Sequence, residues 1–335
     1  MAIGTYVCDL ATLVFALLLF SPSVLLSVDV RVFVKYPLPP GTTGPEAISF
    51  TEYGVGPFTG ISDGSIIKLN PLLGTFEYFA YAAPNKNKTL CDGNSDPSLY
   101  SKCGRPLGSA FNGSDYLYFC DVYFGLNGVG PAGGQATQLV TSAGGQPVYY
   151  CNAVAVDPIN GTVYFLDTSQ RFKNILQMVL ANDRSGRLLS YEPATGNVKV
   201  LENGLAGPAG LAISNDGSYL LISVIITQTI QKFYLTGPKA NTLETLPTSI
   251  LRPGNIERIG SRDEFLVPEN IGPVVHYAIK IDGNGIVLGN ESIAGPYTNV
   301  SYLRDLQPLG DSIFIGSEFD TFVGATASLL GLLSL

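Results

Sequence analysis

A turn followed by a short apolar strand recurs along this chain, and no other feature constrains the fold as strongly. Three clear copies begin at Asn112, Asn160 and Asp216, and each continues through Gly-Ser or Gly-Thr into an apolar run. The copies lie roughly 50 residues apart, a period typical of β-propellers, in which each repeat buries its faces against its neighbours. Segments 62–69 and 185–191 echo each other in the same way. The sequence therefore predicts a β-propeller.

Length and composition agree with one ring of six blades. About 300 residues follow the N-terminal segment, and at this period they supply six blades as a single closed domain. The 38 Gly, 22 Pro, 18 Tyr and 17 Phe alternate turn formers with strand formers, as expected of an all-β protein. We expect the blades to begin near Pro45, Gly104, Asn152, Pro208, Asn255 and Tyr302.

Both ends of the predicted ring depart from the repeat. Residues 28–36 alternate valines with polar residues, which indicates a half-buried strand that completes the last blade and removes its open edge. The apolar end, residues 323–335, lacks the polar turn signals of the other blades. The last blade is therefore expected to be incomplete or atypical.

One helix interrupts the strands. Phe172, Ile175, Leu176 and Val179 repeat at i, i+3, i+4 and i+7, which is the apolar stripe of an amphipathic helix. A helix inserted into a blade loop can roof the entrance of a central pocket or can cap exposed blade edges. The sequence leaves both roles open.

The N-terminal segment predicts entry into the secretory pathway. Residues 10–19 form an apolar run followed by small residues, which is typical of a signal peptide, so we expect residues 1–27 to be a signal peptide and 28–335 the propeller. The residues before the run include Asp9 and no Lys or Arg, which leaves an uncleaved membrane anchor as the alternative. A net charge of −8 argues against nucleic-acid binding.

Cysteines and glycosylation motifs fit an oxidising compartment. Cys91 and Cys103 bracket a polar loop that needs closing, so a disulfide is predicted there. Cys120 and Cys151 lie near the ends of successive strand runs and can pair or remain buried thiols, and free thiols are slightly preferred. Asn-x-Ser/Thr motifs predict glycosylation at five positions, Asn87, Asn112, Asn160, Asn290 and Asn299.

Several long segments carry a family resemblance. They include residues 44–50 (GPEAISF), 103–108 (CGRPLG), 121–139, 152–172 and 207–223. Together they are similar to the plant strictosidine synthase-like proteins over roughly residues 40 to 320. The resemblance implies a six-bladed propeller with a pocket on its axis, in a vacuolar or otherwise secretory protein. It does not fix an activity.

The resemblance also locates the position of the synthase's catalytic base. That enzyme condenses tryptamine with secologanin, using a glutamate of the sixth blade as the base. Counted from Ile313–Gly316, this position falls on Arg304, which cannot accept a proton. Asp305 is adjacent, but neighbouring strand residues point to opposite faces. We therefore assign no catalytic residue and expect no strictosidine formation. The aromatic clamp of the synthase's indole matches Tyr150.

The wider superfamily of calcium-dependent lactonases and esterases suggests a second chemistry. Its calcium ligands are matched here by Glu46, Asn152 and Asn255, whereas two further ligand positions hold Ala209 and Gly254. Three oxygen ligands with one formal charge would bind Ca²⁺ weakly. The alternative is that these three side chains only hydrogen-bond to backbone around the channel.

Two functions of different class remain open. The first is hydrolysis of a small ester or lactone, and the second is a noncatalytic glycoprotein whose central pocket binds a small molecule or a protein partner. The losses at Ala209, Gly254 and Arg304 favour the second. His276, the only histidine, is expected to be structural, and solvated surface is the preferred interpretation of Glu318 and Asp320.

Overall fold

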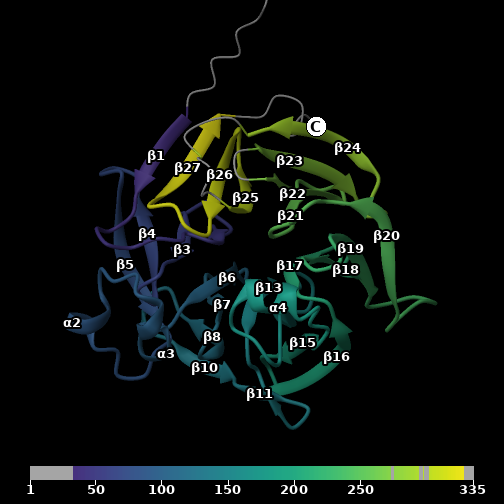
Figure 1. Ribbon diagram of the computed structural model, residues 1–335, viewed down its shortest axis with the longest axis horizontal. Helices are drawn as coiled ribbons and strands as arrows, with labels where there is room; N and C mark the ends of the chain where they lie inside the picture. Colours follow the sequence, from purple (N-terminus) through teal and green to yellow (C-terminus); the bar gives the residue numbers. More distant parts are fainter. Residues whose placement is uncertain (1–32, 273–274, 294–296, 298–301, 328–335) are drawn as a thin grey trace, which may run out of the picture. The chain divides into compact units, whose positions relative to one another are not determined.

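Six antiparallel sheets surround a central axis as the blades of a propeller (Figure 1). The structure, a computed structural model, describes residues 33–272, 275–293, 297 and 302–327. The predicted signal peptide and Asn299 lie outside these residues. The predicted all-β, six-bladed fold is confirmed.

In each blade the first strand named lies nearest the axis, and the others follow outward. Blade 1 contains β2 (Ile48–Ser49), β3 (Phe58–Gly60), β4 (Ser65–Asn70), β5 (Thr75–Tyr81) and β9 (Gly134–Gln135), which is parallel to β5. Blade 2 contains β6 (Pro106–Phe111), β7 (Leu117–Asp121), β8 (Gly125–Val129) and β10 (Thr137–Val140). Blade 3 contains β13 (Cys151–Val156), β14 (Val163–Asp167), β15 (Gly186–Glu192) and β16 (Asn197–Leu205). A small hairpin, β11 (Ser142–Ala143) and β12 (Gln146–Pro147), connects blades 2 and 3.

The other three blades follow the same plan. Blade 4 contains β17 (Pro208–Ile213), β18 (Tyr219–Val224), β19 (Thr229–Tyr234) and β20 (Leu243–Ser249). Blade 5 contains β21 (Glu257–Ile259), β22 (Glu264–Ile271), β23 (Val275–Asp282) and β24 (Val287–Ser292). Blade 6 contains β25 (Leu303–Leu309), β26 (Ser312–Ser317), β27 (Phe322–Ala327) and β1 (Phe33–Pro37).

The first and last strands close the ring. β1 pairs antiparallel with β27, from Phe33 opposite Thr326 to Pro37 opposite Phe322. The prediction that an N-terminal strand completes the last blade is confirmed. This blade has four strands, so the expectation that it is incomplete was wrong: the N-terminal strand supplies the fourth, and the apolar residues from Phe322 form the third.

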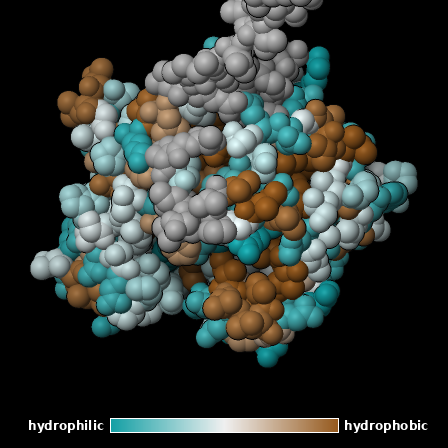
Figure 2. Space-filling view, turned by 45° about the horizontal axis from the view of Figure 1, so that its top comes forward, coloured by the Kyte–Doolittle hydropathy of each residue, from teal (hydrophilic) through white to brown (hydrophobic). Residues whose placement is uncertain are grey.

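The hydrophobic core is divided among the six spaces between adjacent blades. Strand β18 is buried on both faces, so its sequence is apolar throughout and does not alternate with polar residues. Leu220 and Ile222 pack toward blade 3, whereas Tyr219 and Leu221 pack toward blade 5. Figure 2 shows hydrophobic side chains gathered in patches between hydrophilic ones on the surface.

Short helices lie in two loops, one between blades 1 and 2 and one between strands β14 and β15 of blade 3. They are α2 (Lys88–Cys91), the 3-10 helix η1 (Pro97–Leu99), α3 (Tyr100–Cys103) and α4 (Ile175–Leu180). α4 confirms the predicted amphipathic helix, and the Asn174 side chain caps its N-terminus by accepting a hydrogen bond from the Gln177 amide. None of the helices within the described ranges is both long enough and apolar enough for a membrane span.

Two disulfides join segments of blades 1 to 3. Cys91–Cys103 links α2 to α3, as predicted. Cys120 and Cys151 are also bonded, so the preference for free thiols was wrong. Their strands, β7 and β13, belong to adjacent blades that pack face to face, and this packing brings the two Cα atoms to 5.0 Å. Disulfides are typical of proteins of the secretory pathway.

Candidate ligand pocket

Two cavities open at opposite ends of the inner strands. The larger one, about 550 Å³, is called here the α4 pocket, and it lies at the N-terminal ends of the inner strands of blades 1 to 3. The smaller one, about 360 Å³, is called the inner-strand pocket, and the C-terminal ends of all six inner strands line it. The residues lining the α4 pocket include Glu46, Tyr100, Arg105, Tyr123, Tyr149, Tyr150, Arg171, Phe172, Lys173, Ile175, Gln177, Glu318 and Phe319. α4 thus takes part in enclosing a pocket, the first of its two predicted roles.

Arg304 is buried beside the α4 pocket and contacts two of its carboxylates. Its Nε atom lies 3.2 Å from Oε1 of Glu46, and its Nη2 atom lies 2.6 Å from Oε2 of Glu318. The guanidinium group also lies 4.5 Å from the ring centre of Tyr302. Burial opposes the charge of Arg304, but Glu318 and Glu46 raise its pKa above its ordinary value. The guanidinium group therefore stays protonated and neutralises both carboxylates.

Glu46 is paired with a second arginine. Nη2 of Arg105 lies 3.7 Å from Oε2 of Glu46, and Nη1 of Arg105 donates to the Gly44 carbonyl. Burial raises the pKa of the Glu46 carboxyl, and Arg304 and Arg105 oppose that effect. We refer to Glu46, Glu318, Arg105 and Arg304 as the arginine–glutamate cluster. Within it, two positive charges balance two negative ones.

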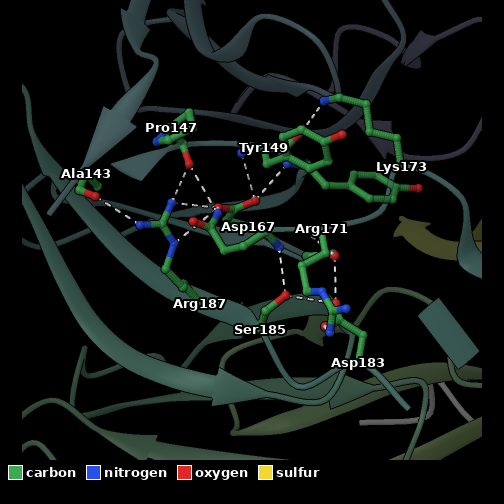
Figure 3. A network of polar contacts seen from close by, with 12 residues as sticks. Ala143, Pro147, Tyr149, Asp167, Arg171, Lys173, Asp183, Ser185 and Arg187 are labelled. Carbon is green, nitrogen blue, oxygen red and sulfur yellow. Dashed lines mark hydrogen bonds and ion pairs between the residues drawn. The ribbon is translucent and has the colours of Figure 1, made fainter. Parts of the chain in front are cut away.

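The tyrosines of the pocket wall are positioned by a buried carboxylate. Asp167, at the end of β14, accepts hydrogen bonds from the backbone amides of Tyr149 and Tyr150, the latter at 2.7 Å (Figure 3). Nε and Nη2 of Arg187 contact the other Asp167 oxygen, and the same guanidinium group donates to the carbonyls of Ala143 and Pro147. This network fixes the start of the inner strand β13, and with it Tyr150.

Blade 2 repeats the arrangement. Asp121, at the end of β7, accepts hydrogen bonds from the amides of Arg105, Tyr123 and Phe124. Burial raises the pKa of Asp121 to about 6, although these hydrogen bonds favour the charged form. In both blades a carboxylate at the end of the second strand therefore holds the chain just before an inner strand.

Lys173 lies between two of the tyrosines. Its Nζ atom donates to the carbonyl of Tyr149 (Figure 3). It also donates to the carbonyl of Val122 at 2.5 Å and lies 4.6 and 4.3 Å from the ring centres of Tyr123 and Tyr149. Burial lowers the pKa of Lys173 to about 8, against the opposing effects of Asp121 and Asp167. The side chain is half-buried and lines the α4 pocket.

Of the three predicted calcium ligands, Asn152 lies in the inner strand β13, and Glu46 and Asn255 lie just before the inner strands β2 and β21. Glu46 faces two guanidinium groups. Asn255 hydrogen-bonds through its side chain to Asp305, and its amide donates to the Arg304 carbonyl at 2.6 Å. Asn152 is buried in β13. Because Arg304 and Arg105 place positive charge beside Glu46, this donor set does not fit Ca²⁺.

Other predicted residues are also placed by the structure. Arg304 and Asp305 point to opposite sides of β25, since Arg304 contacts Glu318 while Asp305 accepts a hydrogen bond from the Ile48 amide at 2.6 Å. His276 is buried, with its Nδ1 atom 2.9 Å from Oδ1 of Asn270. Asn87, Asn160 and Asn290 are exposed, and Asn112 is half-buried in a turn.

Reasoning from the sequence missed several residues of the pocket. Glu318 was interpreted as solvated surface, but it lines the α4 pocket and pairs with Arg304. Its position directly after β26, at the end of the blade from which Arg304 comes, was the signal available. Arg105 and Lys173 stand in connections whose placement depends on how blades 1 to 3 meet.

A second carboxyl pair adjoins the inner-strand pocket. Glu257 lines that pocket and hydrogen-bonds to the fully buried Asp305. Burial raises the pKa of Asp305 to about 7 and raises that of Glu257 well above its usual range. Two carboxyl groups that are hydrogen-bonded to each other share a proton in preference to ionising together.

Comparison with known proteins places this chain. A family model described as strictosidine synthase matches residues 152–238. Protein STRICTOSIDINE SYNTHASE-LIKE 12 from Arabidopsis thaliana is 36% identical over 328 residues, which cover 96% of this chain and 96% of that protein. The chain belongs to the strictosidine synthase family. Strictosidine synthase from Catharanthus roseus, another plant member of the family, is 34% identical over 305 residues, covering 88% of this chain and 85% of that enzyme.

Solved structures agree on the fold. A gluconolactonase from Xanthomonas campestris superposes with a TM-score of 0.61 at 14% identity, covering 89% of each chain. At this level of identity the likeness concerns the propeller alone. Among members of the strictosidine synthase family, this chain must therefore be understood from its own pocket residues.

Proposed function

We propose that this protein binds a flat, neutral or anionic small molecule in the α4 pocket and does not condense amines. The observation that carries the proposal is the position of Arg304, which pairs with both Glu46 and Glu318. The carboxylates that would attract an amine or a metal ion are thereby neutralised within the protein. Aromatic side chains supply stacking surface for a planar ligand.

The charges at the pocket wall support this ligand class. Three basic residues, Arg105, Arg171 and Lys173, line the pocket with two acidic ones, Glu46 and Glu318. Arg304 adds a further positive charge directly behind the acidic pair. A positively charged ligand would be repelled on balance, whereas a carboxylate, hydroxyl or carbonyl group would find hydrogen-bond donors.

Strictosidine formation is expected to be absent. The position predicted for the catalytic base holds Arg304, and the neighbouring Asp305 lies on the other side of the strand, hydrogen-bonded to Glu257. A guanidinium group cannot accept the proton that this condensation transfers. Incubation of the purified protein with tryptamine and secologanin should yield no product by liquid chromatography.

Ester or lactone hydrolysis is less well supported than binding. Its calcium-dependent form requires Glu46 as a free carboxylate ligand, and here Glu46 lies between two arginines. We propose that the α4 pocket operates without a metal ion. Calorimetric titration with Ca²⁺ tests this point, and millimolar affinity or better would contradict it. A protein partner in place of a small molecule remains the second binding function, but a concave pocket with aromatic walls suits the small molecule.

The compartment and glycosylation belong to the same proposal. We propose a glycoprotein of the vacuole or extracellular space, supported by two disulfides and by exposed asparagines at Asn87, Asn160 and Asn290. Glycosidase treatment of the protein purified from plant tissue, followed by intact-mass measurement, checks the glycans. Fractionation of the same tissue distinguishes vacuole from apoplast.

The decisive binding experiment compares ligands of one shape and different charge. Tryptamine, tryptophol and indole-3-propionate carry an amine, an alcohol and an acid on the same ring system. We expect the alcohol and the acid to bind at least about tenfold more tightly than the amine by calorimetry, a difference of about 1.4 kcal/mol. Tyr150→Ala should weaken binding, and Tyr53→Ala, at an exposed tyrosine outside the pocket, is the matched control. Tightest binding of tryptamine would contradict the proposal.

A further inference from the structure

We propose that Lys173 is a carbonyl-reactive lysine that captures aldehydes in the α4 pocket as an imine. The proposal rests on the proposed function, because it assumes that a small molecule enters this pocket. It adds the chemical class of ligand that the pocket can hold covalently.

The geometry around Nζ lets the neutral amine keep both hydrogen bonds of the charged form. An ammonium group has three N–H bonds, and two of those of Lys173 are directed to the carbonyls of Val122 and Tyr149. Loss of the third proton leaves a lone pair while both hydrogen bonds are retained. The backbone thus holds the nitrogen in place in the state that can attack a carbonyl carbon.

The neighbouring carboxylates do not compete for Lys173 as ion-pair partners. Asp121 is bound by the amides of Arg105, Tyr123 and Phe124, and Asp167 is bound by Arg187. No ion pair of the described residues includes Lys173. With its pKa lowered to about 8 by burial, about a tenth of the Lys173 side chains are neutral at pH 7. An ordinary lysine, with a higher pKa, has a far smaller neutral fraction at this pH.

The pocket supplies both access and a place for the aldehyde. Lys173 lines the cavity with the rings of Tyr123, Tyr149 and Phe172, so an aldehyde on an aromatic scaffold can stack while its carbonyl carbon reaches Nζ. The lone pair of Nζ forms the C–N bond, and the carbonyl oxygen takes up a proton. The nitrogen then loses its remaining protons as water leaves, giving the imine. The step needs no oxidant or reductant.

Lys232 provides an internal comparison. Its Nζ atom also lies over two tyrosine rings, at 3.8 and 5.2 Å, and donates to a backbone carbonyl, that of Gly283, at 2.8 Å. Burial lowers its pKa as well. Lys232, however, does not line the α4 pocket. If reactivity depends on the pocket as well as on the amine, Lys173 reacts and Lys232 does not.

Reductive trapping tests the proposal on the intact glycosylated protein. The protein is incubated with 3-phenylpropanal and sodium cyanoborohydride, which converts an imine into a stable secondary amine, and labelled peptides are quantified by mass spectrometry. We expect Lys173 to be labelled at least about tenfold faster than Lys232 or the exposed Lys239, with a rate that saturates and rises from pH 6 to pH 8. The titratable groups that face Nζ are Asp121, Asp167, Tyr123 and Tyr149.

The possible outcomes separate this proposal from the proposed function. Labelling of Lys173 at the rate of Lys239 or Lys232 would overturn the imine, and this comparison within the wild-type protein needs no variant. Calorimetry with 3-phenylpropanol, which has no carbonyl group, measures pocket binding separately. Binding of the alcohol without selective labelling refutes only the imine, whereas loss of both refutes the pocket function too. In Lys173→Arg, which retains a cation but has no amine nucleophile, the fast and saturating component of labelling should be lost.

Discussion

The two ends of the propeller axis neutralise buried carboxyl groups in different ways. At the α4 pocket, Glu46 and Glu318 are paired with Arg304 and Arg105. At the inner-strand pocket, Glu257 and Asp305 hydrogen-bond to each other. Opposite charges balance the first set, and bound protons lower the negative charge of the second.

Because of this difference, the charge at the α4 pocket depends on residues and ligands, whereas the charge at the inner-strand pocket depends on pH. A guanidinium group keeps its charge at any physiological pH, so the arginine–glutamate cluster changes only when a residue or a ligand changes. A shared proton leaves as the pH rises, so the Glu257–Asp305 pair responds to pH without a ligand. The construction differs in parallel, because inserted segments build part of the α4 pocket and inner strands or their immediate continuations line the other.

The largest expected effect comes from removing Arg304, the buried arginine beside the α4 pocket. Arg304→Ala leaves Glu46 buried without its closest counter-charge, so we expect a loss of about 3–5 kcal/mol in the free energy of unfolding, measured with denaturant. Lys239→Ala, which breaks the exposed pair with Glu244, is the control and should change the free energy of unfolding little, because solvent screens this pair.

The same residue can be tested for charge without leaving the buried Glu46 carboxylate unpaired, whereas the half-buried Glu318 loses its contact with Arg304 in both variants. The double variant Glu46→Gln with Arg304→Met replaces the ion pair by neutral groups, and it should recover most of the lost stability. If Arg304→Ala is as stable as Lys239→Ala, the arginine–glutamate cluster does not hold this end of the axis together.

The next effect concerns the segment that carries Tyr100 and Arg105 to the α4 pocket. Cys91 and Cys103, 12 residues apart in sequence, close the loop that contains Tyr100 and ends two residues before Arg105. Changing both to Ser should lower stability by about 3 kcal/mol in the chain-entropy model and weaken ligand binding at the α4 pocket. The pH dependence assigned to Asp305 should not change. An equal disturbance of both ends would show that they are not independent.

A smaller effect is the pH dependence of the free energy of unfolding, which we expect from the inner-strand pocket and not from the arginine–glutamate cluster. Folding raises the pKa of Asp305 from 3.8 to about 7 through burial, so the folded state binds the proton more tightly than the unfolded chain. The resulting stabilisation is full below about pH 4, falls as the pH rises, and is lost above about pH 7. Glu257→Gln removes a second carboxyl group, whose pKa is raised by burial and by Asp305, and so should flatten the pH dependence of stability.

Unfolding free energies at pH 4, 5.5 and 7.5 measure this difference. The wild-type protein should lose on the order of 2 kcal/mol relative to Glu257→Gln across the range. Glu244→Gln, on the exposed outer strand of blade 4, serves as the control, since groups shared by all three proteins cancel. Parallel curves for the wild type and Glu257→Gln would contradict proton sharing.

The fold was predictable because its signals are local. In each blade, turn residues come before a strand and mark where it begins. For example, blades expected to begin near Pro208 and Tyr302 have inner strands that begin at Pro208 and Leu303. The closing strand and α4 were also visible as periodic patterns. Within one blade the chain therefore specifies its own hairpins.

The site was less predictable because its contacts cross between blades. The sequence analysis singled out Glu46 as a metal ligand and Tyr150 and Arg304 as pocket residues. The ion pair between Glu46 and Arg304 was not foreseen, because it joins residues far apart in sequence. Cys120 and Cys151 pair only because two sheets pack face to face. Lys173 reaches its tyrosines from an inserted loop, and no periodic pattern marks that arrangement.

The smallest predicted effect tests whether the inserted helix belongs to one end alone. The Asn174 side chain accepts a hydrogen bond from the Gln177 amide at 3.1 Å and so caps α4, next to Lys173. Asn174→Ala should cost about 1 kcal/mol locally, which corresponds to at most about a fivefold loss of affinity if the fraying helix opens the α4 pocket. Asn174→Asp keeps an N-cap acceptor and should bind like the wild type, whereas the titration of Asp305 should be the same in all three proteins. If the alanine and aspartate variants bind ligand equally well, α4 covers the blade edge without shaping the pocket, and the contrast between an inserted and a strand-built end loses its functional meaning.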